Sequence, residues 1–143
     1  MDSSRRRSRR SGCPISTALD ILGDAWSLLI VRDLMFKGYR TFNEFLKAGE
    51  GIATNVLAER LARLDSAGIL TRRRDRSDAR RWIYRLTEKG IGLAPALVEI
   101  VLWAAEHEQT DAPESTLQAM RSDREAFLTT VREAWAREAD SDE

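Results

Sequence analysis

A helix-forming segment that ends at a glycine and is followed at once by two short basic strands constrains the fold of this chain more than any other feature. Within residues 54–67, leucines recur at helical spacing, and Gly68 fits the position just past the helix end. Residues 69–75 and 80–86 then alternate as strands around a polar turn. A helix beside a basic ribbon can meet two neighbouring parts of a DNA duplex, the major groove and the phosphates.

Shorter helices are predicted before this segment. Pro14 can begin a helix that Gly23 stops, and residues 25–36 have the pattern of a second, mostly buried helix. Thr41 stands three residues before Glu44, the spacing of a capping box at the start of a third helix.

Gly49 and Gly51 supply a turn between the third helix and residues 54–67, and Thr54 is expected to cap the helix that follows. The predicted fold class is therefore mostly α with a small β-hairpin wing, an α+β arrangement. Its order of elements is that of a winged helix-turn-helix.

A long helix is predicted from residue 88 to about residue 106, capped by Thr87 and kinked at Pro95. Apolar residues cover more than one of its faces, and Glu99 is the only charge in its central stretch. A helix that is apolar nearly all round needs burial on two sides, and a small domain supplies only one. We therefore expect a second subunit on the other side. One last amphipathic helix is expected after residues 111–113.

The zero net charge of the 143 residues hides an uneven layout. Residues 1–10 hold 5 Arg and 1 Asp, a net of +4, and residues 54–85 hold 9 Arg and 4 acids, a net of +5. Residues 11–53 sum to −1, so the first 90 residues carry +8 and the other 53 carry −8. A basic front opposite an acidic end favours a polyanionic partner for the first part of the chain.

Several classes of protein are not expected. No apolar run reaches the roughly 18 residues that suggest a membrane span, and no apolar signal core follows the basic N-terminus. One cysteine excludes an intramolecular disulfide, so we expect a cytoplasmic protein. Cys13 and His107 form the only possible thiol–imidazole pair, which supports neither catalysis nor a metal site. No enzyme activity, metal or cofactor is predicted.

Several motifs, taken in order, resemble the HxlR family of bacterial winged-helix transcription regulators. They are CPISTALDILGDAWSLLIVRDLMFKGYRTFNEF at 13–45, GIATNVLAERLARLDSAGILTR at 51–72, YRLTEKG at 84–90, LAPAL at 93–97, and Trp103. The resemblance implies a homodimeric regulator, expected to be a repressor, that binds an inverted-repeat operator. It places helix 54–67 in the major groove, the wing at 72–85 on the backbone or minor groove, and the dimer interface on the N-terminal segment and the long helix.

The resemblance covers roughly residues 13–107 and has departures. Ala53 stands where the family usually has a Ser, the wing turn at 76–79 lacks the family's frequent prolines, and the region beyond Glu108 is longer than the usual tail. We therefore expect three parts, namely a disordered basic arm at 1–12, a DNA-binding and dimerisation domain at 13–107 and an acidic helical extension at 108–143.

The candidate DNA contacts lie on the recognition helix, at the start of the third helix and on the wing. Each has a structural alternative: a solvated helix face, arginines paired with Glu59 or Asp65, or charges that only solubilise a hairpin edge. The basic stretch at 5–10 is either an arm along DNA or a solvated end. The candidates are Arg40, Thr41, Thr54, Asn55, Ala58, Glu59, Arg60, Arg63, Arg74, Arg76, Arg80 and Arg81.

The candidate dimer contacts are Ile15, Leu19, Leu97, Ile100, Val101 and Trp103. Cys13 stands at a predicted helix start near Arg9 and Arg10, which favours the reactive thiolate. Some members of the family it resembles sense electrophiles or oxidants through a cysteine at this position, and the alternative is a packed or capping cysteine.

A small-molecule effector is a further hypothesis. Trp103, Phe127 and Trp135 could line an apolar pocket between the long helix and the last helix, although core packing is the other use of such aromatics. Double-stranded DNA, a second copy of the chain and an electrophile or small-molecule effector are the predicted partners. A winged-helix protein-interaction module that does not bind specific DNA is the alternative function.

Overall fold

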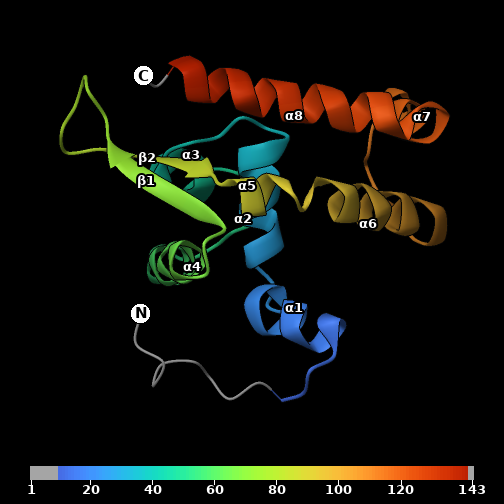
Figure 1. Ribbon diagram of the computed structural model, residues 1–143, viewed down its shortest axis with the longest axis horizontal. Helices are drawn as coiled ribbons and strands as arrows, with labels where there is room; N and C mark the ends of the chain where they lie inside the picture. The colour runs from blue at the N-terminus through green and yellow to red at the C-terminus, as the bar shows by residue number, and fades with distance from the viewer. Residues whose placement is uncertain (1–9, 142–143) are drawn as a thin grey trace.

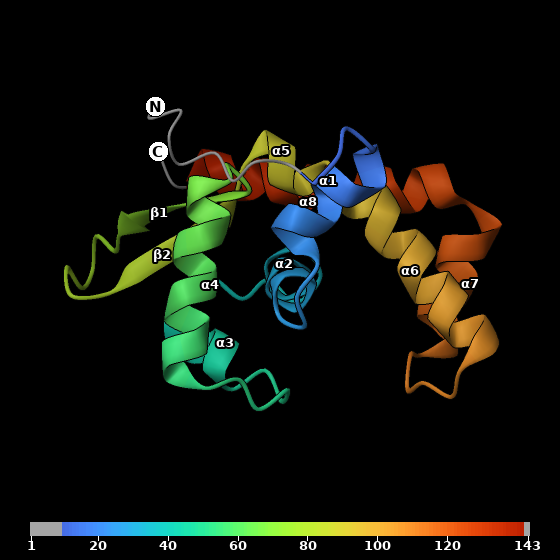
Figure 2. The same ribbon diagram turned by 90° about the horizontal axis from the view of Figure 1, so that it is seen from below.

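The computed structural model describes residues 10–141 and confirms a mostly helical chain with one antiparallel hairpin (Figures 1 and 2). The predicted arm at 1–12 lies mostly outside the described residues. The elements are α1 (Pro14–Leu22), α2 (Ser27–Met35), α3 (Phe42–Leu46), α4 (Thr54–Ser66), β1 (Leu70–Arg74), β2 (Trp82–Leu86), α5 (Glu88–Ile91), α6 (Ala94–His107), α7 (Glu114–Ser122) and α8 (Arg124–Ser141).

The helix-turn-helix consists of α3, a glycine-containing turn and α4. Gly49 and Gly51 have φ angles of 94° and 75°, in the left-handed region that glycine enters without a steric penalty. Arg32 of α2 ties this turn down, because its guanidinium donates to Glu50 at 2.9 Å and to Asp33 at 2.8 Å. The predicted capping box is confirmed, since Thr41 and Glu44 bond each other's backbone N–H groups.

The core of the winged helix lies between α2, α4 and the hairpin. The three leucines of α4 are buried, as their spacing predicts, and pack with Ile30, Val31 and Leu34 of α2 in one cluster. Phe45 and Tyr84 close this cluster with an edge-on contact of 5.8 Å between ring centroids. Burial of this stripe therefore decides which face of α4 remains exposed.

The hairpin pairs in register from Leu70 opposite Leu86 to Arg74 opposite Trp82. On the other edge of β2, the Tyr84 N–H donates to the carbonyl of Arg40 at 2.8 Å. The wing extends away from the helices at the left of Figures 1 and 2. Its base is thus held from both edges, whereas its turn projects outward.

The chain after the wing returns to the end of α4. Gly68, with φ of 78°, follows α4, as expected, and Lys89 donates to the carbonyl of Ala67 at 2.7 Å. Gly90 lies so close to the start of β1 that an added Cβ would clash with the carbonyl oxygen of Ile69. Thr87 caps α5 by accepting from the Gly90 N–H, as predicted.

Two of the predicted helices are each divided in the structure. The long helix is interrupted at Gly92 and Leu93, and Pro95 lies in the first turn of α6, where its missing N–H costs nothing, rather than at a kink inside a helix. The last helix is split at Asp123, whose extended backbone ends α7 and whose carboxylate accepts from the Ala126 N–H. An aspartate that can cap a helix start is the signal that could have revealed this second break.

The C-terminal pair α7–α8 folds back onto the winged helix. In Figure 1, α8 runs along the top, across the hairpin base and α2 from α4. Phe127 packs on Phe36 with 6.2 Å between ring centroids, and the Trp135 indole N–H donates to the Leu86 carbonyl at 2.8 Å. The predicted pocket between Trp103, Phe127 and Trp135 is not formed by these contacts, because Trp103 is 61% exposed and lies against His107.

One helical stretch could cross a membrane by length and composition alone. Glu88–His107 spans 20 residues with a mean hydropathy of 1.2, and only 28% of that window is buried. The expectation that no run reaches this length is therefore wrong. The bent pair Pro14–Leu22 and Ser27–Met35 passes the same test together. A core helix of a globular domain also passes it, so the finding describes how apolar this stretch is.

Candidate nucleic-acid interface

One face of α4 is free of contacts with the core. Thr54, Asn55, Ala58 and Glu59 are exposed along the side opposite the buried leucines. The prediction that Thr54 caps this helix is wrong, because Ala53 holds the N-cap position and α4 begins at Thr54. Since no side chain caps α4, its first backbone N–H groups are available to an anion at this end.

Arg60 and Arg63 are held by a residue that the sequence analysis did not single out. The Nε of Arg60 lies 2.9 Å from an Asp24 carboxylate oxygen, and a terminal nitrogen of Arg63 lies 3.5 Å from the other oxygen. Both arginines also pair with Glu59, as anticipated, whereas Asp65 is not among their partners in the described residues. Arg60, only 21% exposed, therefore joins α4 to the loop before α2 and is a poor candidate for a DNA contact.

Asp24 is the centre of this clamp. Its carboxylate also accepts from the backbone N–H groups of Trp26 and Ser27, at 2.9 and 3.0 Å, and from the Ser27 hydroxyl. Burial opposes its charge, but the hydrogen bonds from Ser27, Trp26 and Arg60 outweigh burial and lower the pKa of Asp24 well below its ordinary value. One carboxylate thus caps α2 and fixes the position of α4.

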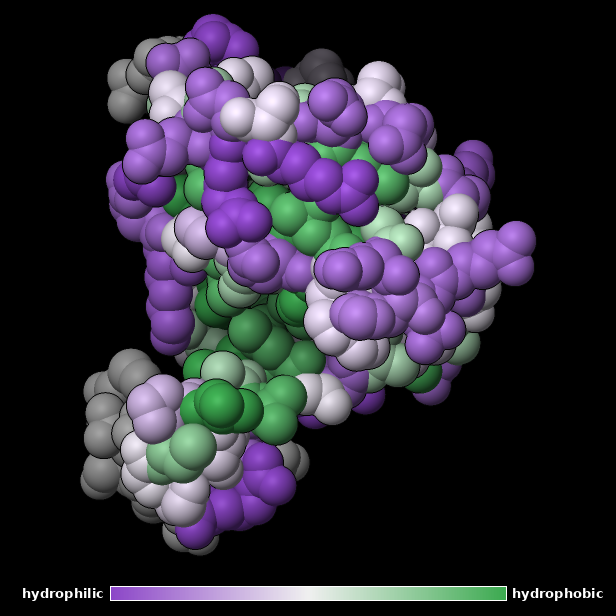
Figure 3. Space-filling view, turned by 90° about the vertical axis from the view of Figure 1, so that its right-hand side faces the viewer, coloured by the Kyte–Doolittle hydropathy of each residue, from purple (hydrophilic) through white to green (hydrophobic). Residues whose placement is uncertain are grey.

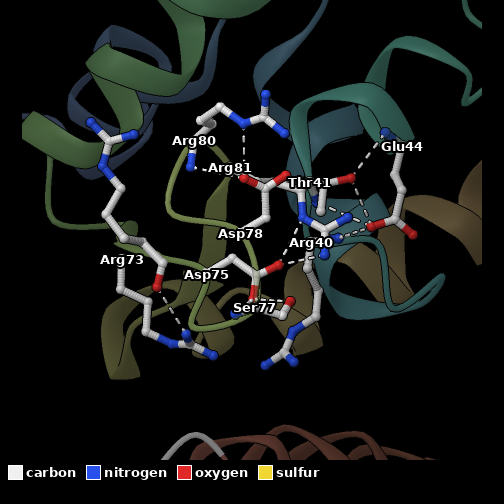
Figure 4. Close-up of polar contacts among 10 residues, drawn as sticks. Arg40, Thr41, Glu44, Arg73, Asp75, Ser77, Asp78, Arg80 and Arg81 are labelled. Carbon is white, nitrogen blue, oxygen red and sulfur yellow. Dashed lines mark hydrogen bonds and ion pairs between the residues drawn. The ribbon is translucent and has the colours of Figure 1, made fainter.

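Acidic residues at the turn of the wing hold two of its arginines (Figure 4). Asp75 accepts from the Ser77 N–H at 3.0 Å and from Arg81, and these bonds lower the pKa of Asp75 to about 2. Arg80 pairs with Asp78 at 3.2 Å, yet its side chain is 92% exposed. Both arginines stay at the surface, and Asp75 and Asp78 already offset part of their charge.

The inner face of the hairpin holds a cluster that sequence reasoning found only in part. The guanidinium carbons of Arg72 and Arg74 lie 4.2 and 3.8 Å from the centroid of the Trp82 ring. Of these three, only Arg74 was a predicted DNA contact. The alternation of strand residues could have revealed the others, because Arg72 and Arg74 share a face, and Trp82 pairs directly with Arg74.

Arg40 and Thr41 do not join this surface in the same way. Arg40 extends away from Arg80 in Figure 4 and pairs with Glu138 of α8 at 3.7 Å. Its side chain is thus directed to the C-terminal helix, which argues against a DNA contact. Thr41 lines a hollow with Arg80 and Trp82 while it caps α3. Arg76 is exposed at the turn.

The candidate dimer residues lie on a separate face. Helix α1 has no buried residue, and Ile15 and Leu19 are 72% and 53% exposed. On α6, Ile100 and Trp103 are 48% and 61% exposed. Figure 3 shows apolar side chains gathered in the hollow between the lobe of α1 and the rest of the molecule.

The other residues predicted at the dimer interface differ in exposure. Leu97 is 6% exposed and belongs to the core of the single chain, so it offers little surface to a second copy. Val101 is partly exposed. Cys13 is exposed at the N-cap of α1, and nearby Arg10 pairs with Asp20 at 3.0 Å, whereas Arg9 lies outside the described residues.

Comparison with known proteins gives one consistent result. A family model described as HxlR-like helix-turn-helix matches residues 21–112. An uncharacterised HTH-type transcriptional regulator of Mycobacterium bovis is 37% identical over 99 residues, which cover 69% of this chain and 61% of that protein. The matched part thus spans less than two thirds of that relative.

Solved structures agree with this match. The redox regulator HypR in its oxidised form has a TM-score of 0.61 at 27% identity, with 68% of this chain and 100% of HypR covered. The reduced transcriptional regulator YodB from Bacillus subtilis has a TM-score of 0.56 at 31% identity, with 68% and 95% covered. YodB has also been solved bound to a quinone and after diamide treatment. The relatives are thus helix-turn-helix regulators, and some respond to redox conditions or quinones.

The Asp24 clamp gives a stability prediction. Replacing Asp24 by Ala should destabilise the fold by about 2 kcal/mol at pH 7, because it removes a helix cap and leaves Arg60 without this partner. Since folding lowers the pKa of Asp24, its contribution is fully present above the ordinary value of 3.8 and is lost as the pH falls toward the folded-state pKa.

Urea unfolding at pH 7, 5, 4 and 2.5 measures this contribution. The difference between wild type and Asp24→Ala should narrow only below about pH 4. Asp20→Ala, which removes an exposed pair with Arg10, is the matched control and should change stability by less than about 0.5 kcal/mol. A wild-type advantage that stays constant down to pH 2.5 contradicts the assignment.

Proposed function

This chain belongs to the HxlR-like helix-turn-helix family, and from that premise we propose that it is a homodimeric transcriptional regulator that reads an inverted-repeat operator. The exposed face of α4 beside the arginines of the wing carries the proposal. Thr54, Asn55 and Ala58 meet base edges in the major groove, while Arg74, Arg76, Arg80 and Arg81 meet phosphates or the minor groove.

Glu59 and Arg63 complete the proposed surface at its margin. Arg63 is 40% exposed and holds Asp24 and Glu59 only at 3.5 and 3.6 Å, so it can turn toward a phosphate. Glu59 is an acceptor for a cytosine amino group once Arg63 moves. Arg60 stays in the clamp. A protein-interaction module without DNA binding remains the alternative outcome, and it predicts no salt-dependent association with DNA.

Replacing Arg80 or Arg81 by Ala should weaken binding to all DNA sequences alike, because each contacts phosphate rather than bases. Each change should lower the slope of log affinity against log salt by about 1 for each phosphate left without its arginine in each half-site. Asn55→Ala should instead cost about 1 to 3 kcal/mol for the operator and relax the choice at one base pair.

Titration of the operator and a scrambled duplex between 50 and 200 mM salt separates these effects. Glu125→Gln on α8 is the control, because this exposed residue lies outside the proposed interface. Wing variants with unchanged affinity and salt slope refute the wing contacts. A wild-type protein that binds neither duplex favours the interaction module.

The apolar face on α1 and α6 supports the homodimer. Leaving large apolar side chains in water costs about 1.5 to 3 kcal/mol apiece, and four such residues are exposed here. A second copy packed on this face would cover Ile15 and Leu19 together with Ile100 and Trp103. It would also place two recognition helices on one side, where a separation of about 34 Å suits successive major grooves.

Sedimentation equilibrium at micromolar concentration should show two chains. Trp103→Glu should shift the protein toward one chain by placing a charge in the interface without disturbing the core, since this side chain is exposed in the protomer. Gln118→Glu, an equal charge change on the surface of α7, should leave two chains. A wild type that sediments as a clean monomer refutes the proposal.

We further propose that modification of Cys13 changes operator affinity. Cys13 is exposed and adjoins α1, so a small shift at the proposed interface would alter the spacing of the two recognition helices. The relatives HypR and YodB, described as a redox regulator and solved with a quinone, suggest an oxidant or quinone as the effector.

Treatment with diamide or a quinone should change operator affinity several-fold in wild type and leave Cys13→Ser unchanged. Mass spectrometry establishes how much of Cys13 has reacted. Equal affinity of treated and untreated wild type, with Cys13 shown to be modified, would leave this cysteine without a sensing role.

A further inference from the structure

The stack of two arginines on Trp82 stands apart from the other charges of the wing. Arg74 pairs directly opposite Trp82 across the hairpin, and Arg72 lies two residues before it on the same face. Both guanidinium groups lie over the indole ring, and Arg74 also donates to the Ala79 carbonyl at 3.0 Å. The ring therefore fixes two long side chains that would otherwise sample many rotamers.

The charge of this stack is not offset by carboxylates. Within residues 10–141, neither Arg72 nor Arg74 forms an ion pair, whereas Arg80 and Arg81 pair with Asp78 and Asp75. An arginine stacked through its planar face keeps its edge N–H groups available for hydrogen bonds. The stack thus holds two positive charges in place and leaves them ready for an anion.

The stack lies in the angle between the wing and the recognition helix. Arg72 lines a hollow with Ala58 and Ala62 on the exposed side of α4. Trp82 lines a neighbouring hollow with Thr41 and Asn43 at the start of α3. A DNA backbone that borders the groove occupied by α4 would pass through this angle.

We propose that Trp82 is a positioning residue that holds Arg72 and Arg74 against phosphates of the DNA strand bordering the groove. The proposal rests on the proposed function and adds to it a specific support for two of its contacts. Preorganised arginines bind phosphate with less loss of side-chain freedom, so removal of the ring should weaken binding although the arginines remain.

A double-mutant cycle separates positioning from a merely structural role. Arg72→Gln with Arg74→Gln removes both charges, and Trp82→Leu keeps apolar volume but removes the aromatic face. We expect the paired glutamines to weaken operator binding by about tenfold or more in wild type, and by only about twofold in Trp82→Leu. Trp82→Phe, which retains a ring, should restore part of the affinity and part of the coupling.

Arg80→Gln is the matched control, because Arg80 is held by Asp78 and does not lie over the ring. Its cost in operator affinity should be the same in wild type and in the Trp82→Leu variant. Urea unfolding of each variant establishes that all are folded at the temperature of the titrations. Salt slopes give a second readout, since the loss of the stack should reduce the slope as the loss of the arginines does.

The outcomes distinguish this proposal from the one on which it rests. If wild type binds the operator but the paired glutamines cost the same in both backgrounds, the positioning role of Trp82 is wrong and the proposed function stands. If wild type shows no salt-dependent binding to any duplex, both are wrong. Coupling confined to Arg72 and Arg74, with none for Arg80, supports the proposal.

Discussion

Burial of the leucine stripe on α4 is the constraint on which the proposed interface depends. Leu57, Leu61 and Leu64 are at most 3% exposed, and because they lie on one side of the helix their burial fixes its rotation. Removing each from water contributes about 1.5 to 3 kcal/mol, so turning α4 by even one residue position would be costly. The face with Thr54 and Asn55 is exposed as a consequence. Asp24 adds a polar constraint by holding Arg60 in place from the loop before α2.

The basic character of the wing is not evenly available. Arg81 and Arg80 have acidic partners in the turn, which give the turn its shape and reduce its local field. Arg72 and Arg74 lean on an aromatic ring, a partner that orders a guanidinium without neutralising it. A count of arginines therefore overstates the charge at the tip and understates the order at the inner face.

The C-terminal helices and the apolar face divide the remaining surface between them. The α7–α8 pair lies beyond the residues matched by the family model and covers α2 and the base of the hairpin through Phe127 and Trp135. It leaves the side of α6 that carries Ile100 and Trp103 uncovered, as it leaves α1. The same helices direct Arg40 toward Glu138 rather than toward the wing. One part of the chain thus completes the protomer, and the other exposes the surface that suits a second copy.

The sequence by itself determined the local structure. Leucine spacing predicted α4, the Thr41–Glu44 pair predicted the start of α3, and Gly68 predicted the end of α4, because each depends on residues within a few positions of one another. Thr54 as a cap and two unbroken helices were wrong, since a single backbone turn at Gly92 or Asp123 changes little in the apolar pattern. Only the tertiary structure decided which charges are held and which are available: Asp24 meets Arg60 from 36 residues away, and Glu138 meets Arg40 from the far end of the chain. Pairing over such distances depends on how the helices pack, and periodicity along the chain carries no record of it.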